Sequence, residues 1–307
     1  MDKFVQIVVN GLTLGSVYAL IALGYSMVYG VLKLLNFAHG DVYMIGAYIG
    51  YGVLSALGGA TDPAISIWVV LVLMVLAAMA GCAVLGVAIE RFAYRPLRNA
   101  PRIAPLISAL GVSFFLSYSA QLLFGAQHYT YDAFSIAGGK LFFSGINWGP
   151  LHVALLRIIV IVSPLVLMVV LTLLVSRSRI GKAMRATSFD REAAAMMGID
   201  IDRVIVFTFI VGSALAGAAG VMFGLRADIF PTMGFTAGLK GFSAAVIGGI
   251  GSVPGAMIGG LLLGLVEAFT QAYITGSWSD LVVFSLLIAM MVVRPTGLLG
   301  KTDIRKV

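Results

Sequence analysis

The chain has 307 residues, of which 60% are hydrophobic and only 11% are charged, and its mean hydropathy is +1.04. Soluble globular domains are nearer half apolar and a quarter charged, so this composition excludes an ordinary soluble protein and indicates a chain solvated by lipid. The single cysteine, Cys82, excludes a disulfide framework and a thiolate metal site.

The predicted elements are helices, because the apolar stretches are long and continuous and lack the ten-residue alternation of membrane strands. The run from Phe4 to Tyr29 is too long for a cleavable signal peptide. We expect one domain over residues 1–307, a polytopic all-α bundle of about eight to ten transmembrane helices. The candidate spans are 5–30, 34–57, 64–90, 104–124, 153–175, 204–224, 235–250, 254–274 and 280–294.

The net charge of +7 is concentrated in three short segments, which hold fourteen of the 20 lysines and arginines. They lie at 91–102, 177–203 and 294–306. Clusters at span ends follow the positive-inside rule, so the charge predicts topology and does not indicate nucleic-acid binding. We expect these segments in the cytoplasm, and the loop 125–152, with only Lys140 as a basic residue, outside.

The side of the N-terminus stays open. Counting spans back from 91–103 places it outside, whereas Lys3 slightly favours the inside, and a re-entrant segment within 1–60 would reverse the orientation. Aromatic rings that favour the interface are expected at the outer boundary, at Trp68, Trp148 and Trp278.

Small residues recur at every fourth position along several spans, most clearly at Gly212, Ala216, Gly220 and Gly224. Such rows let helix backbones approach closely, because packing drives helix association in lipid. They predict a compact bundle whose helices are packed tightly enough to slide or rock.

The glycine-rich stretch GGIGSVPGAMIGG at 248–260 is not a nucleotide-binding loop, because Pro254 occupies the third glycine position of the GxGxxG pattern that begins at Gly249. The sequence also lacks a P-loop, an HExxH motif, a nucleophile elbow and carboxylates at metal spacing. We therefore expect no catalysis, no metal and no cofactor on this chain.

Polar residues interrupt an apolar region at Asn36, His39 and Asp41. A carboxylate within a span usually faces the bundle interior or water, so these side chains could line a substrate path. Alternatively, they satisfy backbone groups at a turn or broken helix, which is the interpretation we favour.

A second polar group is Lys240 with Glu267 and Gln271, which are four residues apart on one helix face. A Lys240–Glu267 pair would neutralise both charges in low dielectric. We favour this structural pairing over direct substrate contact, and the second interpretation stays open.

The segment 176–203 is charged and forms an amphipathic helix by its pattern. Thr187 followed by Asp190 fits a capping box, and Gly198 is a natural helix stop. Phe189, Ala193, Met196 and Met197 share one helical face, beside a basic stripe at Arg179, Lys182 and Arg185. An apolar stripe of this kind rests either on lipid headgroups or in the groove of a partner protein.

Within this segment, REAAAMMGID at 191–200 resembles the EAA signature of ATP-binding-cassette (ABC) importer permeases. With the stretches 11–48, 181–220 and 245–268, the chain resembles the branched-chain amino acid and ribose permease superfamily over most of its length. Within that superfamily it is most similar to permeases of high-affinity leucine/isoleucine/valine importers. The downstream proline found elsewhere in the superfamily is absent.

The resemblance implies the ABC importer permease fold, with 176–203 as a loop that docks on an ATPase. The residues that it places in this coupling loop are Gly181, Arg185, Phe189, Asp190, Glu192, Ala193, Ala194, Met197 and Gly198. It also implies the partners: a second homologous permease, two cytoplasmic ATPases that carry ATP and Mg, and a periplasmic substrate-binding protein. The expected location is the lipid bilayer of a bacterial inner membrane.

Two other functions compete with a branched-chain amino acid permease. One is an ABC permease for another small solute, such as ribose, urea or a short amide. The other is an ion-coupled secondary transporter, in which Asp41 and Glu267 would bind protons or cations. A passive channel is disfavoured, because no single span is polar enough to line a pore.

Overall fold

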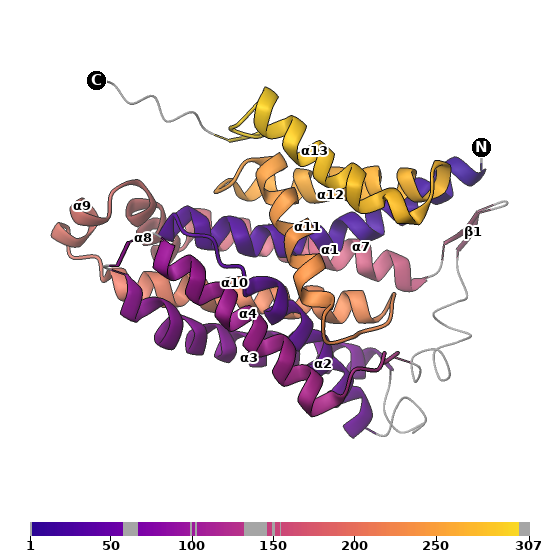
Figure 1. Ribbon diagram of the computed structural model, residues 1–307, viewed down its shortest axis with the longest axis horizontal. Helices are drawn as coiled ribbons and strands as arrows, with labels where there is room; N and C mark the ends of the chain where they lie inside the picture. Colours follow the sequence, from indigo (N-terminus) through magenta and orange to yellow (C-terminus); the bar gives the residue numbers. More distant parts are fainter. Residues whose placement is uncertain are drawn as a thin grey trace.

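The computed structural model describes residues 2–57, 67–98, 100–101, 103–131, 146–148, 151–153 and 155–300. These residues form a helical bundle in which the long helices run roughly side by side (Figure 1). The helices are α1 (Asp2–Leu32), α2 (His39–Ala56), α3 (Ile67–Ile89), α4 (Ile103–Phe124), α7 (Leu155–Arg177), α8 (Arg179–Phe189), α9 (Arg191–Met196), α10 (Ile201–Gly224), α11 (Met233–Gly248), α12 (Val253–Tyr273) and α13 (Ser279–Val293). A π-helical turn η2 (Glu90–Tyr94) and a 3₁₀ turn η3 (Arg95–Leu97) extend α3, and η4 (Gly276–Trp278) precedes α13.

Every candidate span overlaps a described helix, and seven of the described helices are long and apolar enough to cross a membrane, where eight to ten were expected of the whole chain. The two candidate spans without such a helix are 34–57, which holds α2, and 235–250, which holds α11. α2 starts at His39 and not at 34, because Lys33 has a φ of 57° and the chain leaves helical geometry after α1. α11 has only 16 residues, about 24 Å of helix, less than the ~30 Å hydrocarbon core.

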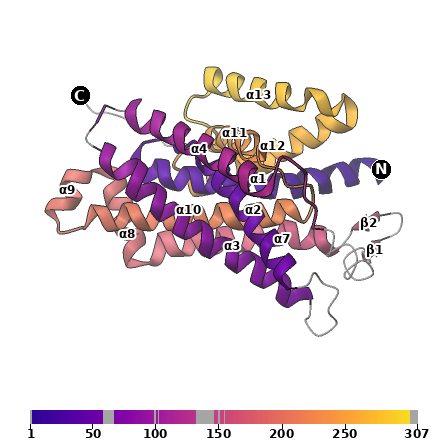
Figure 2. The ribbon, with the colours of Figure 1, turned by 60° about the horizontal axis from the view of Figure 1, so that its bottom comes forward.

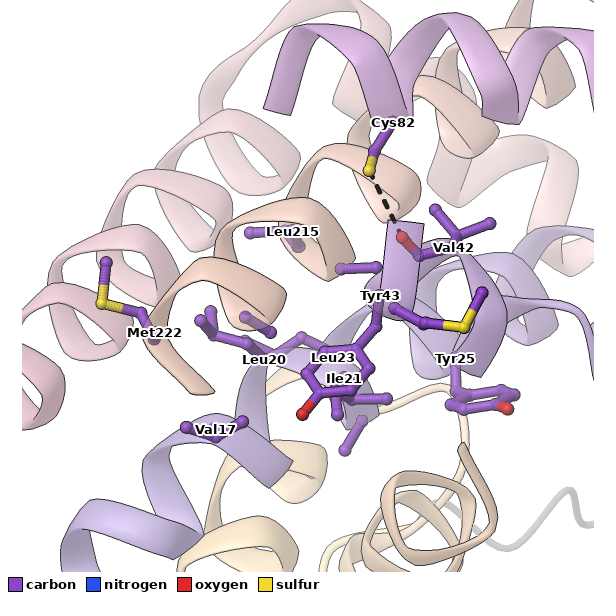
Figure 3. Packing of buried hydrophobic residues seen from close by; sticks show 14 of the residues in the cluster. Val17, Leu20, Ile21, Leu23, Tyr25, Val42, Tyr43, Cys82, Leu215 and Met222 are labelled. Carbon is purple, nitrogen blue, oxygen red and sulfur yellow. Dashed lines mark hydrogen bonds between the residues drawn. The ribbon is translucent and has the colours of Figure 1, made fainter. Parts of the chain in front are cut away.

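The core is centred on α1, which packs against α12, α10 and α11. Leu20 and Ile21 of α1 are completely buried, and Figure 3 shows them near Tyr43 of α2. A β-carbon on Gly264 of α12 would overlap the backbone of Gly15 in α1, so the small-residue rows do bring helix backbones into contact.

The bundle has two distinct ends (Figures 1 and 2). We call the end that carries α8 and α9 the coupling end, and the end with the start of α1 the far end. At the far end, part of the predicted loop 125–152 forms a short antiparallel hairpin, β1 (Ile146–Trp148) and β2 (Leu151–Val153). Lys140 and the tail 301–307 lie outside the described residues, as does the side chain of Trp148.

Candidate functional site

The coupling end is built from two short helices, not one. The Ser178 hydroxyl accepts a hydrogen bond from Gly181 N at 2.9 Å and begins α8. Asp190 is extended (φ −150°, ψ 117°), and its carboxylate accepts from Ala193 N at 3.0 Å, which begins α9. Gly198 (φ 82°) ends α9 in the left-handed region that favours glycine.

The predicted capping box was therefore wrong at Thr187. This residue lies inside α8 and is only 1% exposed, because its side chain packs against the bundle. The helix stop predicted at Gly198 is confirmed.

The single helical face predicted for the apolar residues is wrong, because Phe189 ends α8 and Met196 ends α9, but their side chains are strongly exposed. Phe189 is 95% exposed, Met196 81% and Met197 83%. Glu192 and Arg185 are also exposed, and Ala193 is half-buried.

Two residues of the predicted coupling set point inward. Ala194 is buried, and Gly181 is buried so closely against the end of α7 that a β-carbon would overlap the carbonyl oxygen of Val175. These two residues therefore position α8 and α9 and do not present a surface.

The α9 helix is tied directly to the centre of the bundle. Arg191 Nη2 donates to the carbonyl oxygen of Val31, at the end of α1, at 2.9 Å. Partial burial and the nearby Arg98 guanidinium lower the pKa of Arg191. Arg191 therefore connects α9 to the end of α1 by a charged hydrogen bond.

An ion cluster beside this contact was missed by the sequence analysis, which interpreted the basic residues at 91–102 as a topology signal only. Arg98 bridges Glu90, which is fully buried, and Asp202 in the first turn of α10. Arg95 also pairs with Asp202, at 2.6 Å. A carboxylate at the very end of an apolar span, as at Glu90, was the available signal.

The side chains of Asn36, His39 and Asp41 contact different parts of the bundle. Tyr94 Oη, in the π-helical turn, donates to Asn36 Oδ1 at 3.1 Å and to the carbonyl of Leu35 at 3.2 Å. The His39 ring is fully buried against α1, where a β-carbon at Gly24 would overlap Nε2.

Asp41 lies elsewhere. Its Oδ1 accepts from Ser117 Oγ of α4 at 2.7 Å and lies beside Gly234 of α11. Since Asn36, His39 and Asp41 each contact a different part of the bundle, they do not form one site. They join the residues before α2 and its first turn to four neighbouring elements.

The second polar group does come together. Lys240 Nζ of α11 lies 2.9 Å from Glu267 Oε1 of α12 and 2.8 Å from Asp280 Oδ1 of α13. Tyr18 Oη of α1 donates to Glu267 Oε2 at 2.9 Å, and Gln271 Nε2 donates to Oε1 at 3.3 Å. The network joins four helices and balances the buried ammonium, and its member Asp280 was not foreseen.

Within the described residues, no group of three His, Cys, Asp or Glu side chains is placed to hold a metal ion. Cys82 is buried, and its Sγ donates to the carbonyl oxygen of Val42 at 3.3 Å (Figure 3). What remains is a bundle with an exposed apolar corner at one end and charged networks between its helices.

Comparison with known proteins agrees with this description. Residues 7–291 match the family model described as branched-chain amino acid transport system / permease component. The chain is 42% identical to the high-affinity branched-chain amino acid transport system permease protein LivH of Escherichia coli K12, over 99% of this chain and 98% of the relative. It is also 42% identical to the permease protein BraD of Pseudomonas aeruginosa, with the same coverage.

The chain is also similar to a second kind of permease, at lower identity. The permease protein LivM of Escherichia coli K12 is 27% identical over 94% of this chain and 69% of its own length. No solved structure matches the chain.

Proposed function

The chain belongs to the family of branched-chain amino acid transport permeases, and from this premise we propose that it forms half of the membrane path of an ATP-driven importer for leucine, isoleucine and valine. The other half is a second, homologous permease. This chain carries out no bond chemistry. It supplies two conformations and the contacts that convert one into the other.

The exposed corner of α8 and α9 is the observation that carries the proposal. Phe189, Met196 and Met197 expose large apolar side chains among charged residues. Exposure of such a stripe to water is unfavourable, and it is relieved when the side chains are buried in a protein groove or at a lipid surface. We assign it to the groove of a cytoplasmic ATPase, which binds ATP and Mg, because Arg191 joins this corner to the end of α1.

The proposed cycle follows from this connection. A substrate-binding protein delivers the amino acid at the far end, in the periplasm of a bacterial inner membrane. Closure of two ATPases on ATP displaces α8 and α9, and the permease pair alternates between outward and inward openings. The interior is stabilised during this motion by polar contacts between helices. They are made by Asp41 and by the Lys240–Glu267–Asp280 network with Gln271, and Asn36 and His39 add contacts at the start of α2.

Uptake of labelled leucine tests the proposal, in cells with and without this chain. The protonmotive force is collapsed while ATP is maintained. We expect chain-dependent uptake to survive. Loss of uptake with the gradient would overturn ATP coupling and favour ion binding at Asp41 and Glu267. Leucine uptake that never depends on the chain would overturn the substrate, and chain-dependent uptake of labelled ribose or urea would then be measured.

A further inference from the structure

One side of α11 is open, although other helices surround it. Thr232, Phe235 and Thr236 are exposed around the first turn, whereas Gly234 packs inward on Gly40 of α2. Both ribbon views place α11 between α4 and α13 (Figures 1 and 2). α4 packs on α2 and η2, while α13 packs on α12 and on α11. The open side is therefore a face with α4 on one flank and α13 on the other.

This open side begins inside the bundle. A β-carbon on Gly234 would lie 2.7 Å from Asp41 Oδ1, and the same oxygen accepts the hydrogen bond from Ser117. Ser117 lies seven residues before the end of α4, which is about 10 Å along the helix axis. The first turn of α11 is thus at a depth where a surrounding bilayer would consist of hydrocarbon.

The backbone at this depth needs polar partners. The Thr232 side chain makes no capping hydrogen bond to the first turn of α11 within the described structure. The first N–H groups of a helix have no intrahelical acceptor, and hydrocarbon offers none. In α11, the Met233 N–H group donates to the carbonyl oxygen of Phe230 at 3.2 Å. Non-helical backbone and uncapped helix ends at membrane depth are tolerated where they face protein or water.

Charged groups flank the same face. Asp41 is fully buried, and its Oδ2 has no hydrogen-bond partner among the described residues. On the other flank, the side chain of Asp280 is 56% exposed while it pairs with Lys240. A carboxylate without a full set of partners is costly in lipid and is stabilised by water or by a cationic ligand.

We propose that the open side of α11, between α4 and α13, lines the water-filled path of the substrate, and that the second permease closes the path opposite it. This assignment rests on the proposed function, which requires such a path. The exposed carboxylate of Asp280 suits the ammonium group of a zwitterionic amino acid. Phe235, 49% exposed, offers apolar contact to its side chain.

Reaction of introduced cysteines with a charged, water-soluble thiol reagent tests the assignment. Phe235→Cys and Thr236→Cys are compared with Val170→Cys in opened membranes that hold the assembled transporter. Val170 is 53% exposed and, like Ser117, lies seven residues from the end of its helix, but it is on α7. The natural Cys82 is fully buried and serves as an unreactive reference.

We expect the two α11 cysteines to react at least about tenfold faster than Val170→Cys, because the thiolate is the reactive species and an apolar environment suppresses it. Equal rates for α11 and α7 would overturn the assignment, whether lipid or a tightly packed partner covers α11. The labelling rates and leucine uptake are measured separately, so failure of the path assignment is distinguishable from failure of the proposed substrate. Fast α11 labelling without leucine uptake would support the assignment of the path and overturn only leucine as the substrate.

Discussion

The coupling end exposes apolar side chains, whereas the interior of the bundle buries charged ones. At the coupling end, Phe189 and Met197 are apolar side chains without cover. In the interior, Lys240 and Glu267 are charges in apolar surroundings, each with partners from other helices. The first arrangement is complete only when another protein arrives, whereas the second is complete within this chain. An exposed apolar stripe thus indicates a partner, and a buried charge indicates a neighbour that is distant in sequence.

The largest effect is expected from breaking the interior network. Lys240→Met leaves the carboxylates of Glu267 and Asp280 without their cation, and we expect a loss of about 3–5 kcal/mol in stability. Thermal unfolding of the purified transporter in detergent measures it. The double change Lys240→Met with Glu267→Gln is expected to recover much of the loss, and a double variant as unstable as the single one would contradict the pairing.

A smaller effect is expected where His39 is wedged against α1. Gly24→Ala places a methyl group on the His39 ring, and overpacking of this kind costs about 1–3 kcal/mol. Thermal unfolding again provides the measurement. Combining it with His39→Ala removes the obstructing ring, so the two changes together should cost less than their sum. Strict additivity would show that His39 is not what makes Gly24 necessary.

The coupling end should respond in binding more than in global stability. Gly198→Val forces a branched residue into a left-handed conformation at a cost of about 1–2 kcal/mol, which distorts the end of α9. We expect the chain to insert normally but to capture less ATPase in a pull-down. Glu192→Lys, which reverses a charge on the exposed surface, should act in the same direction.

Gly111→Val provides the matched control for this experiment, because Gly111 is helical and has open space around its Cα. ATPase capture by the Gly198→Val chain at the level of the Gly111→Val chain would contradict the docking assignment.

The smallest effect is expected at the junction of the two regions. Tyr94→Phe removes the donor to Asn36 and Leu35, and a lost hydrogen bond of this kind costs about 0.5–1.5 kcal/mol. If the contact also transmits movement to the segment before α2, the amount of leucine transported per ATP hydrolysed will fall. Tyr118→Phe, at an exposed position, should leave both quantities unchanged.

The sequence by itself determined which parts of the chain are helical and where the charged segments between them lie. Hydropathy is a property of the residues along the chain, so every predicted span from 5–30 to 280–294 overlaps a helix, although the helix in 34–57 starts only at His39. The stop at Gly198 was also predictable, because it depends on residues a few positions apart, whereas the break between α8 and α9 at Asp190 was not foreseen.

Tertiary structure alone decided where the polar side chains meet. Periodicity cannot show that Asp280 reaches Lys240, or that Glu90 and Asp202 share Arg98, because these partners lie on different helices. The same limit applies to Asn36, His39 and Asp41, which are neighbours in sequence but contact different elements. In a membrane bundle, helix formation is decided locally by lipid and the backbone, whereas the pairing of buried charges depends on how the helices pack.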